Sequence, residues 1–245
     1  MIFQPIASSS KGNAYLVADG ECRILLECGI PFKRLQKALD YQVQELTACL
    51  ITHEHKDHAG HVDKLIAAGV PVYATAGTIN ALQNLEIRPF LMLQGNNIGA
   101  PLRVGTFVVV PFRTFHDARE PVGFVIRDSR DEILVFATDT GGLAYQFPGA
   151  SIIAVEANYQ EERLSRNTRI PEQTIERIRN THMEIEQTAD FLAKQDLSKC
   201  REIWLLHLSD WSGDDGLFVD LVERAVPNHI LVRCAPKEAK KNELV

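Results

Sequence analysis

The sequence lacks the features of secreted, membrane-spanning and disulfide-stapled proteins. No apolar run approaches the length of about 18 residues that a bilayer-spanning helix needs, and the opening segment MIFQPIASSS has neither the basic region nor the long apolar core of a secretion signal. The five cysteines are odd in number and form no CxxC pair, which favours reduced, mostly buried thiols over a disulfide framework. We therefore expect a cytoplasmic protein that does not bind a membrane.

The sequence also lacks an excess of positive charge. The 26 Lys and Arg residues are outnumbered by 32 Asp and Glu residues, and the formal net charge of −6 argues against a surface built for nonspecific nucleic-acid binding. A polyanionic substrate is still compatible with this charge, because divalent ions reverse the local sign at a site. One segment gathers the arginines Arg163, Arg166, Arg169, Arg177 and Arg179. This segment is either a solvated helix face or a surface that contacts substrate, and the sequence leaves both interpretations open.

Length and patterning favour one large α/β domain that covers residues 1–245. The 45% hydrophobic fraction is sufficient for a sizeable core, and no shift in composition marks a linker. Short β-rich apolar runs predict strands at 2–6, 14–17, 23–26, 48–52, 70–74, 103–112, 123–127, 132–138, 152–156, 202–207 and 229–232. Helical spacing predicts helices at 31–39, 61–68, 172–179, 185–194 and 216–225. Two groups of strands, each with helices, favour two facing sheets with helices outside.

A dense group of metal-ligand side chains follows the predicted strand 48–52. The run Thr52-His53-Glu54-His55-Lys56-Asp57-His58 brings three imidazoles and an aspartate together at the end of that strand. Neutral imidazole and carboxylate are the ligands that suit zinc, manganese or iron. A set of solvated loop histidines is the alternative, and the density of the group disfavours it.

Three more candidate ligands each stand just past an apolar run. His116 follows the run 106–112, Asp139 follows the run 133–137, and His207 follows the run 203–206. Loops that leave the ends of strands gather at one edge of a sheet, where sites are usually built.

The HxHxDH motif and these three downstream residues resemble the metallo-β-lactamase superfamily. The resemblance implies a four-layer αββα sandwich, classed as α/β (α+β), that holds two divalent ions, Zn²⁺ or Mn²⁺. It implies His53, His55 and His116 for one ion, Asp57, His58 and His207 for the other, and Asp139 with a hydroxide bridging the two. Glu27 stands where members usually have an aspartate that supports the metal loop, so it is left outside the ligand set.

A second pair of residues resembles the phosphodiesterase branch that contains the ribonuclease Z enzymes. Glu156 ends a predicted strand, and His182 stands before the predicted helix 185–194. The resemblance implies that Glu156 orients and charges His182, that His182 protonates the leaving oxygen, and that Asp57 also steers the nucleophile. The alternative is that His182 caps a helix while Glu156 forms a surface salt bridge.

Segments along most of the chain resemble the YycJ/WalJ group, bacterial enzymes of the same fold regarded as DNA exonucleases. These segments are residues 7–13 (ASSSKGN), 116–126 (HDAREPVGFVI), 137–141 (ATDTG), 156–158 (EAN) and 205–209 (LLHLS). Ser9, Tyr159 and the segment 183–185 depart from the pattern of the group. The serine-rich loop 8–13 either contacts phosphate or bonds its own backbone.

The resemblance implies a metal-dependent hydrolase, specifically a phosphodiesterase or nuclease with a nucleic-acid substrate, DNA before RNA. A small-molecule hydrolase of the same fold, acting on a cyclic phosphodiester, a thioester or a lactone, is the alternative. A nonhydrolytic metal protein is disfavoured because no predicted ligand is missing. The sequence carries no signal for an oligomeric state.

Overall fold

The structure is a computed structural model that describes residues 1–92 and 97–238. The chain divides into two compact units. Of the described residues, the first unit comprises those in 1–113, 118–132 and 236–238, and the second comprises Thr114–Asp117 and Ile133–Ala235. The single domain expected from composition remains a proposal. Within the described residues, no helix combines the length and the apolar character needed to cross a bilayer.

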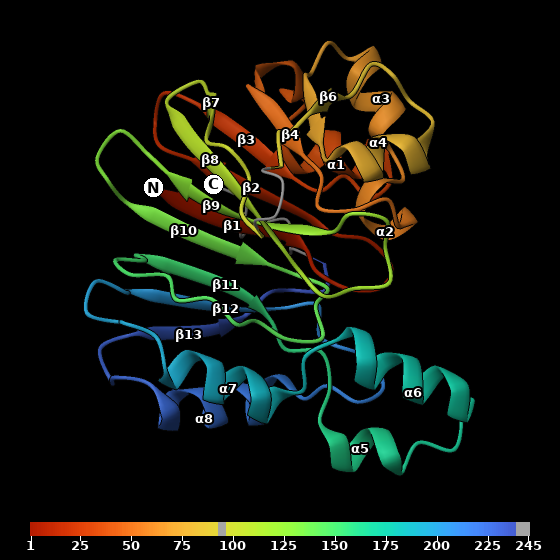
Figure 1. Cartoon of the computed structure of the whole chain (residues 1–245), viewed down its shortest axis with the longest axis vertical. Coiled ribbons are helices and arrows are strands. Elements are labelled where there is room, and N and C mark those ends of the chain that lie inside the picture. The colour runs from red at the N-terminus through yellow and green to blue at the C-terminus, as the bar shows by residue number, and fades with distance from the viewer. Residues whose placement is uncertain (93–96, 239–245) are drawn as a thin grey trace. The chain divides into compact units, whose positions relative to one another are not determined.

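The first unit contains a six-stranded sheet whose strands lie in chain order (Figure 1). The strands are β1 (Ile2–Ala7), β2 (Ala14–Ala18), β3 (Arg23–Leu26), β4 (Ala48–Leu50), β5 (Val72–Ala74) and β6 (Arg88–Pro89). β1, β2 and β3 pair antiparallel, whereas β3 to β6 pair parallel. Leu26 lies beside Leu50 in the register of β3 and β4, so the residues that follow these two strands emerge at one edge.

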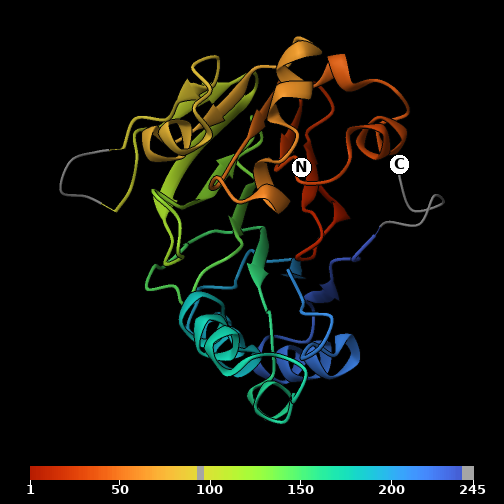
Figure 2. The ribbon, with the colours of Figure 1, turned by 90° about the vertical axis from the view of Figure 1, so that its right-hand side faces the viewer.

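Short helices connect the parallel strands of this sheet, as parallel pairing requires. They are α1 (Phe32–Ala38), α2 (Lys56–Ala59), α3 (Val62–Ala67) and α4 (Ala76–Leu82). Leu35 of α1 and Leu65 of α3 are fully buried in one apolar cluster with Leu25 and Cys49 of the sheet. Figures 1 and 2 show α1, α3 and α4, in orange, on one side of the first unit's strands.

The first unit also contains an antiparallel ladder of three strands. They are β7 (Leu102–Val104), β8 (Phe107–Arg113) and β9 (Val122–Arg127). The prediction of one strand over 103–112 was wrong, because a two-residue turn divides the run and pairs Val104 with Phe107. Gly105 adopts a φ of 59° in this turn, a conformation that glycine reaches without steric cost.

The second unit is built on four parallel strands and the helices between them. The strands are β10 (Ile133–Ala137), β11 (Ile152–Glu156), β12 (Glu202–Leu206) and β13 (Leu231–Cys234), paired in that order. The helices are α5 (Glu161–Ser165), α6 (Glu172–Thr181), α7 (Ile185–Ala193) and α8 (Asp215–Ala225). α7 packs against α8, and α8 packs against β13 (Figure 1). Every residue of β11 is buried, as is typical of a parallel strand covered on both faces.

The carboxyl ends of these parallel strands bring polar residues to one edge. In the register, Ala137 lies beside Val155 and Glu156 lies beside Leu206. Asp139 is two residues past the end of β10, and His207 is the first residue past β12. Strand pairing therefore places Asp139, Glu156 and His207 together, although they are far apart in the sequence.

Candidate metal centre

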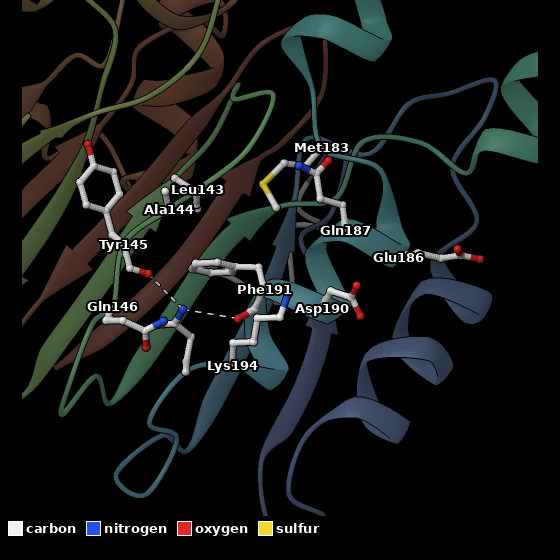
Figure 3. Close-up of a pocket in the computed structure, with 11 residues that line it drawn as sticks. Leu143, Ala144, Tyr145, Gln146, Met183, Glu186, Gln187, Asp190, Phe191 and Lys194 are labelled. Carbon is white, nitrogen blue, oxygen red and sulfur yellow. Dashed lines mark hydrogen bonds between the residues drawn. The ribbon is translucent and has the colours of Figure 1, made fainter.

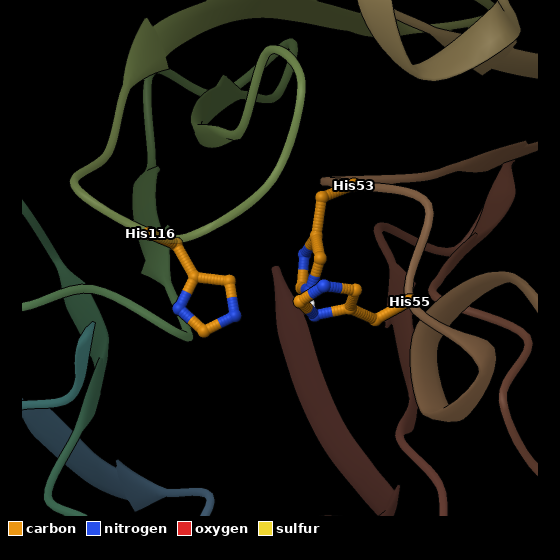
Figure 4. Close-up of side chains that lie close together, drawn as sticks. All are labelled: His53, His55 and His116. Carbon is orange, nitrogen blue, oxygen red and sulfur yellow. Dashed lines mark hydrogen bonds between the residues drawn. The ribbon is translucent and has the colours of Figure 1, made fainter. Parts of the chain in front are cut away.

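In the first unit, the loop after β4 brings the histidines of the motif together. His53 is buried, and its Nε2 lies 3.1 Å from Nδ1 of His55 (Figure 4). The His53 ring also lies 4.2 Å from the His58 ring, measured between centroids. The Thr52 hydroxyl lies 2.8 Å from Nδ1 of His53, on the side of the ring away from His55.

Two residues from distant strands hold the Asp57–His58 turn in place. Asn13, just before β2, donates its backbone N–H to the Asp57 carbonyl at 2.8 Å, and its side-chain amide lies 3.1 Å from Nε2 of His58. Gly29, just after β3, packs so closely that a Cβ there would lie 1.6 Å from the Asp57 carbonyl oxygen. Any residue other than glycine at this position would displace the turn.

Glu27 contacts both ends of this loop, at Thr52 and at His58. It is fully buried, its Oε2 accepts from the Thr52 N–H at 3.3 Å, and its Oε1 lies 3.6 Å from Nδ1 of His58. Burial raises the pKa of Glu27, while His58 and Thr52 oppose that rise. Glu27 thus faces Nδ1 of His58, while Nε2 of the same ring faces the Asn13 side chain.

In the second unit, His116 is fixed by a backbone carbonyl. Its Nδ1 lies 2.9 Å from the Thr181 carbonyl oxygen and therefore carries the proton, so Nε2 is the nitrogen that could bind a metal ion. That Nε2 lies 3.6 Å from Oδ2 of Asp139. Burial lowers the pKa of His116, although Asp139 and the Thr181 carbonyl oppose the shift, and a neutral imidazole is the form that binds metal.

Glu156 is the centre of the second unit's cluster. One carboxylate oxygen lies 2.6 Å from Nδ1 of His182 and 3.1 Å from Nδ1 of His207. The other oxygen accepts backbone N–H groups from Thr140 at 2.8 Å and Met183 at 3.3 Å. Burial opposes ionisation of Glu156, but the charge of His182 and the bonds from both histidines outweigh it, so its pKa is lowered.

His182 is neither a solvated residue nor a helix-start cap. It occupies the short link between α6 and α7, where its backbone N–H donates to the Ile178 carbonyl, and it is 7% exposed. Glu184, rather than His182, caps α7 by accepting the N–H groups of Glu186 and Gln187. Because Glu156 is fully buried, the alternative of a surface salt bridge is wrong.

Backbone strain coincides with two of the predicted ligands in this unit. Asp139 has a φ of 47° and His207 a φ of 54°, both in the left-handed region that few non-glycine residues adopt. Such conformations cost about 1–3 kcal/mol each and persist where the surrounding contacts fix them. The side-chain amide of Asn158 donates to the His207 carbonyl at 2.8 Å, which is one such contact.

The donor set of the second unit fits a divalent metal ion. Ligand atoms of Asp139, Glu156, His182 and His207 all lie within 4.8 Å of one another, and all four residues are buried. Both oxygens of Glu156 are engaged by five donors, the fifth being the side-chain amide of Asn158 at 3.4 Å. Asp139, His207 and the nearby His116 are therefore the groups best placed to hold an ion. Buried imidazole and carboxylate in this number match the chemistry of zinc and manganese sites.

The structure agrees with the second interpretation of the serine-rich loop, in which hydroxyls bond nearby backbone, because the Ser9 hydroxyl accepts the Lys11 N–H at 3.3 Å. Ser8 and Ser9 are buried, the Ser8 hydroxyl lies 2.7 Å from the Tyr15 hydroxyl, and the Ser9 N–H donates to the side chain of Asn13. Gly12 has a φ of 149°, and a Cβ there would lie 2.8 Å from the Gly29 carbonyl oxygen. The loop thus holds Asn13, whose support of the metal loop sequence reasoning missed.

A pocket of about 540 Å³ lies beside α7 in the second unit (Figure 3). Gln195 is one of its lining residues, and its side-chain amide donates to the carbonyl oxygens of Tyr145 and Phe191. Its charged lining residues are Glu186, Asp190 and Lys194. Two carboxylates against one ammonium make it a poor site for a phosphodiester backbone.

Comparisons with known proteins agree with this architecture. A family model described as "Beta-lactamase superfamily domain" matches residues 22–207. The chain is 28% identical to the exodeoxyribonuclease YycJ of Bacillus anthracis over 222 residues, which cover 84% of this chain and 82% of that protein.

Two solved structures share the fold. The metallo-β-lactamase fold protein YhfI of Bacillus subtilis aligns with a TM-score of 0.70 and 17% identity, covering 97% of each chain. The short form of human tRNase Z aligns with a TM-score of 0.66 and 15% identity, covering 98% of each chain. The predicted fold class, the resemblance to YycJ and the prediction of a metal-dependent hydrolase are confirmed, and the chain belongs to the beta-lactamase superfamily.

Proposed function

We propose that the chain is a metal-dependent phosphodiesterase that cleaves nucleic acid, with DNA as its substrate. Two zinc or manganese ions are held by His53, His55, Asp57, His58, His116, Asp139 and His207. The observation that carries the proposal is the buried pair of Glu156 and His182, whose Oε1 and Nδ1 atoms lie 2.6 Å apart beside two of those ligands. The names of the relatives, an exodeoxyribonuclease and a tRNase Z, support a nucleic-acid substrate.

The pair supplies a proton donor at a defined atom. Nδ1 of His182 faces Glu156, so Nε2 is the ring atom that delivers the proton, and it can do so only when both ring nitrogens are protonated before the leaving oxygen of the phosphodiester departs. The Glu156 carboxylate lies 2.6 Å from Nδ1 of His182 and fixes the direction of its ring. Such a general acid contributes about 10² to 10⁴ in rate.

Divalent ions, when bound, lower the pKa of water and stabilise the charge that develops on the attacked phosphoryl group. The residues of the chain orient the imidazole rings and the attacking water. The Thr181 carbonyl and Glu156 hold the ring orientation of His116 and His207 through their Nδ1 atoms. Asp57 orients the attacking water in addition to its ligand role.

The test is a comparison of substrates with the purified protein in Mn²⁺ or Zn²⁺. End-labelled single-stranded DNA, duplex DNA and RNA, together with bis(p-nitrophenyl) phosphate and a thioester, are assayed in parallel. Cleavage of the phosphodiesters is expected, with DNA turned over faster than RNA. Thioester hydrolysis without phosphodiester cleavage would overturn the proposal in favour of a small-molecule hydrolase.

A ligand variant tests the assignment of the metal site separately. Asp139→Asn is expected to lower the metal content of the purified protein and its turnover together, because Asp139 lies 3.4 Å from His207 and 3.6 Å from His116. Metal content is measured by elemental analysis after gel filtration. Full metal content and normal turnover in this variant would show that Asp139 does not hold the metal.

A further inference from the structure

The second unit exposes a tryptophan just beyond a predicted metal ligand. Trp211 is 58% exposed in the loop between β12 and α8, four positions after His207. An indole is a large apolar surface that proteins usually cover in part, and an exposed one often marks a contact with a ligand or partner. More than half of the Trp211 surface therefore remains open to a ligand.

An arginine lies against the Trp211 ring. The guanidinium carbon of Arg169 is 5.6 Å from the centroid of the indole, within the range of a cation–π contact. The other arginines of the segment each pair with a carboxylate, as Arg163–Asp214, Arg166–Glu162, Arg177–Asp117 and Arg179–Glu161. Within the part of the chain that the structure describes, no ion pair engages Arg169, so its charge is available to an external anion.

The two segments that carry this pair are held together before any ligand binds. Arg163 of α5 pairs with Asp214 at the start of α8, and the Gln160 N–H donates to the Ser212 carbonyl at 2.9 Å. The Ser209 hydroxyl accepts the backbone N–H of Trp211 at 3.2 Å. A platform that is ordered in advance loses less entropy when a ligand stacks on it.

Hydrogen bonds also connect the Trp211 loop to the sheet edge that carries Asp139, Glu156 and His207. The Ser209 N–H donates to the Asn158 carbonyl at 2.8 Å, while the side-chain amide of Asn158 donates to the His207 carbonyl. Four residues of chain span at most about 14 Å, which bounds the distance from the Cα of His207 to that of Trp211. Nucleotides in a stacked strand repeat about every 3.4 Å, so this reach corresponds to no more than about four nucleotides.

We propose that Trp211 and Arg169 form a stacking platform for one base of a single-stranded nucleic acid, within four nucleotides of the bond that is cut. The inference rests on the proposed phosphodiesterase function and names the form of its substrate. Stacking requires an open base face, which a single strand presents and an intact duplex does not. Arg169 meets the neighbouring phosphate, so an aromatic ring and a cation act together, as in proteins that bind single strands without sequence preference.

Trp211 can report on its own occupancy, because the chain has two tryptophans and Trp204→Phe leaves Trp211 as the sole indole. Titration of this variant with a single-stranded oligonucleotide in EDTA, which prevents cleavage, is expected to quench its fluorescence saturably. Trp211→Ala should weaken binding about 5- to 150-fold, and Trp211→Phe should retain most of it. Leu231→Ala, which removes another exposed apolar side chain of the same unit, is the matched control and should bind normally.

Two further measurements separate the ring from the charge. An abasic oligonucleotide of the same length should bind the protein and Trp211→Ala equally, because it offers no base to stack. Arg169→Gln should reduce the slope of log affinity against log salt by about 0.7, the value for one phosphate of a single strand. The platform would be overturned if the oligonucleotide bound saturably without changing the Trp211 fluorescence. It would also be overturned if Trp211→Ala lost the same affinity for the normal and the abasic strand. Trp211 would then be assigned to a contact with a protein partner.

The outcomes also distinguish the platform from the proposed function. If binding depends on Trp211 but no metal ion supports hydrolysis, the proposed phosphodiesterase activity is wrong and the stacking platform still holds. If the unaltered protein cleaves the strand in the presence of metal and Trp211→Ala binds and cleaves it equally well, the phosphodiesterase activity holds and the stacking platform is wrong.

Discussion

At the scale of single residues, one buried carboxylate organises the second unit's cluster. Glu156 contacts His182 and His207 through one oxygen and two backbone N–H groups through the other. With the side-chain amide of Asn158 it has five donors, and such a buried carboxylate stays ionised because hydrogen bonds to the charged form offset its desolvation. Glu156 therefore sets the tautomers of both histidines, which makes it a positioning residue for His182.

The role of His182 can be separated from a structural one. His182→Ala should leave metal content near that of the unaltered protein, because the proposed ligands are other residues, while turnover falls at least about 100-fold as expected for the loss of a general acid. Turnover is measured with a phosphodiester and metal by elemental analysis. His229→Ala, which removes an exposed histidine of the same unit, is the control. Nearly normal turnover in His182→Ala would return this residue to a structural role.

Gly29 gives a second prediction at this scale. Gly29→Ala places a Cβ about where the Asp57 carbonyl oxygen now lies, at 1.6 Å, so the Asp57–His58 turn must move. Metal content and thermal stability should both fall. Gly216→Ala is the control, because its Cβ would meet only Oδ1 of Asp214 at 3.7 Å, an ordinary contact. Metal content in Gly29→Ala equal to that of the control would contradict the claim that this close approach positions the ligands.

At the scale of elements, sequence patterns predicted those helices and strands whose periodicity is local. The helices predicted at 172–179, 185–194 and 216–225 are α6, α7 and α8 with small shifts at their ends. The short helices α2, α4 and α5 were missed, since four to seven residues carry too little periodicity to stand out. The hairpin of β7 and β8 was read as one strand because its turn lacks the usual Asn-Gly or Asp-Gly signal.

In the candidate site too, local sequence patterns predicted some residues, whereas others depend on contacts between segments that are distant in the sequence. The predicted residues stand in motifs or at strand ends, both of which are visible in the sequence. The supporting contacts of Asn13, Gly29 and Asn158 depend on which strands become neighbours, and no local pattern encodes that pairing. Asn13 and Asn158 do lie in the quoted segments ASSSKGN and EAN, so their presence was noted but their partners were not.

Helix α8 carries the element-scale prediction. Phe218 is fully buried and anchors this helix, which packs on α7 and β13. Phe218→Ala should lower the free energy of unfolding by about 3–5 kcal/mol, from the lost burial and the cavity left behind. Asp220→Ala, at an exposed position of the same helix, should change it by no more than about 0.5 kcal/mol. Urea denaturation measures both, and similar values for the two variants would show that α8 is not held through Phe218.

At the scale of the whole molecule, bound metal should act as a stabilising ligand. A group that binds only the folded protein adds about 2.7 kcal/mol when its concentration is 100 times its dissociation constant. Protein stripped with EDTA should therefore melt at a lower temperature than protein with Zn²⁺ or Mn²⁺ restored. Mg²⁺ and Ca²⁺ should restore less, because they prefer oxygen ligands and the proposed set is rich in imidazole.

The choice of variant decides whether such a shift comes from the proposed site. Asp139→Asn should melt at nearly the same temperature with and without Zn²⁺, since it lacks the carboxylate that lies within 3.6 Å of both His116 and His207. His229→Ala should keep the full metal-dependent shift, because that exposed histidine is outside the proposed set. Equal shifts in both variants would place the stabilising ion elsewhere, while no shift in the unaltered protein would remove the basis for metal-dependent catalysis by this chain.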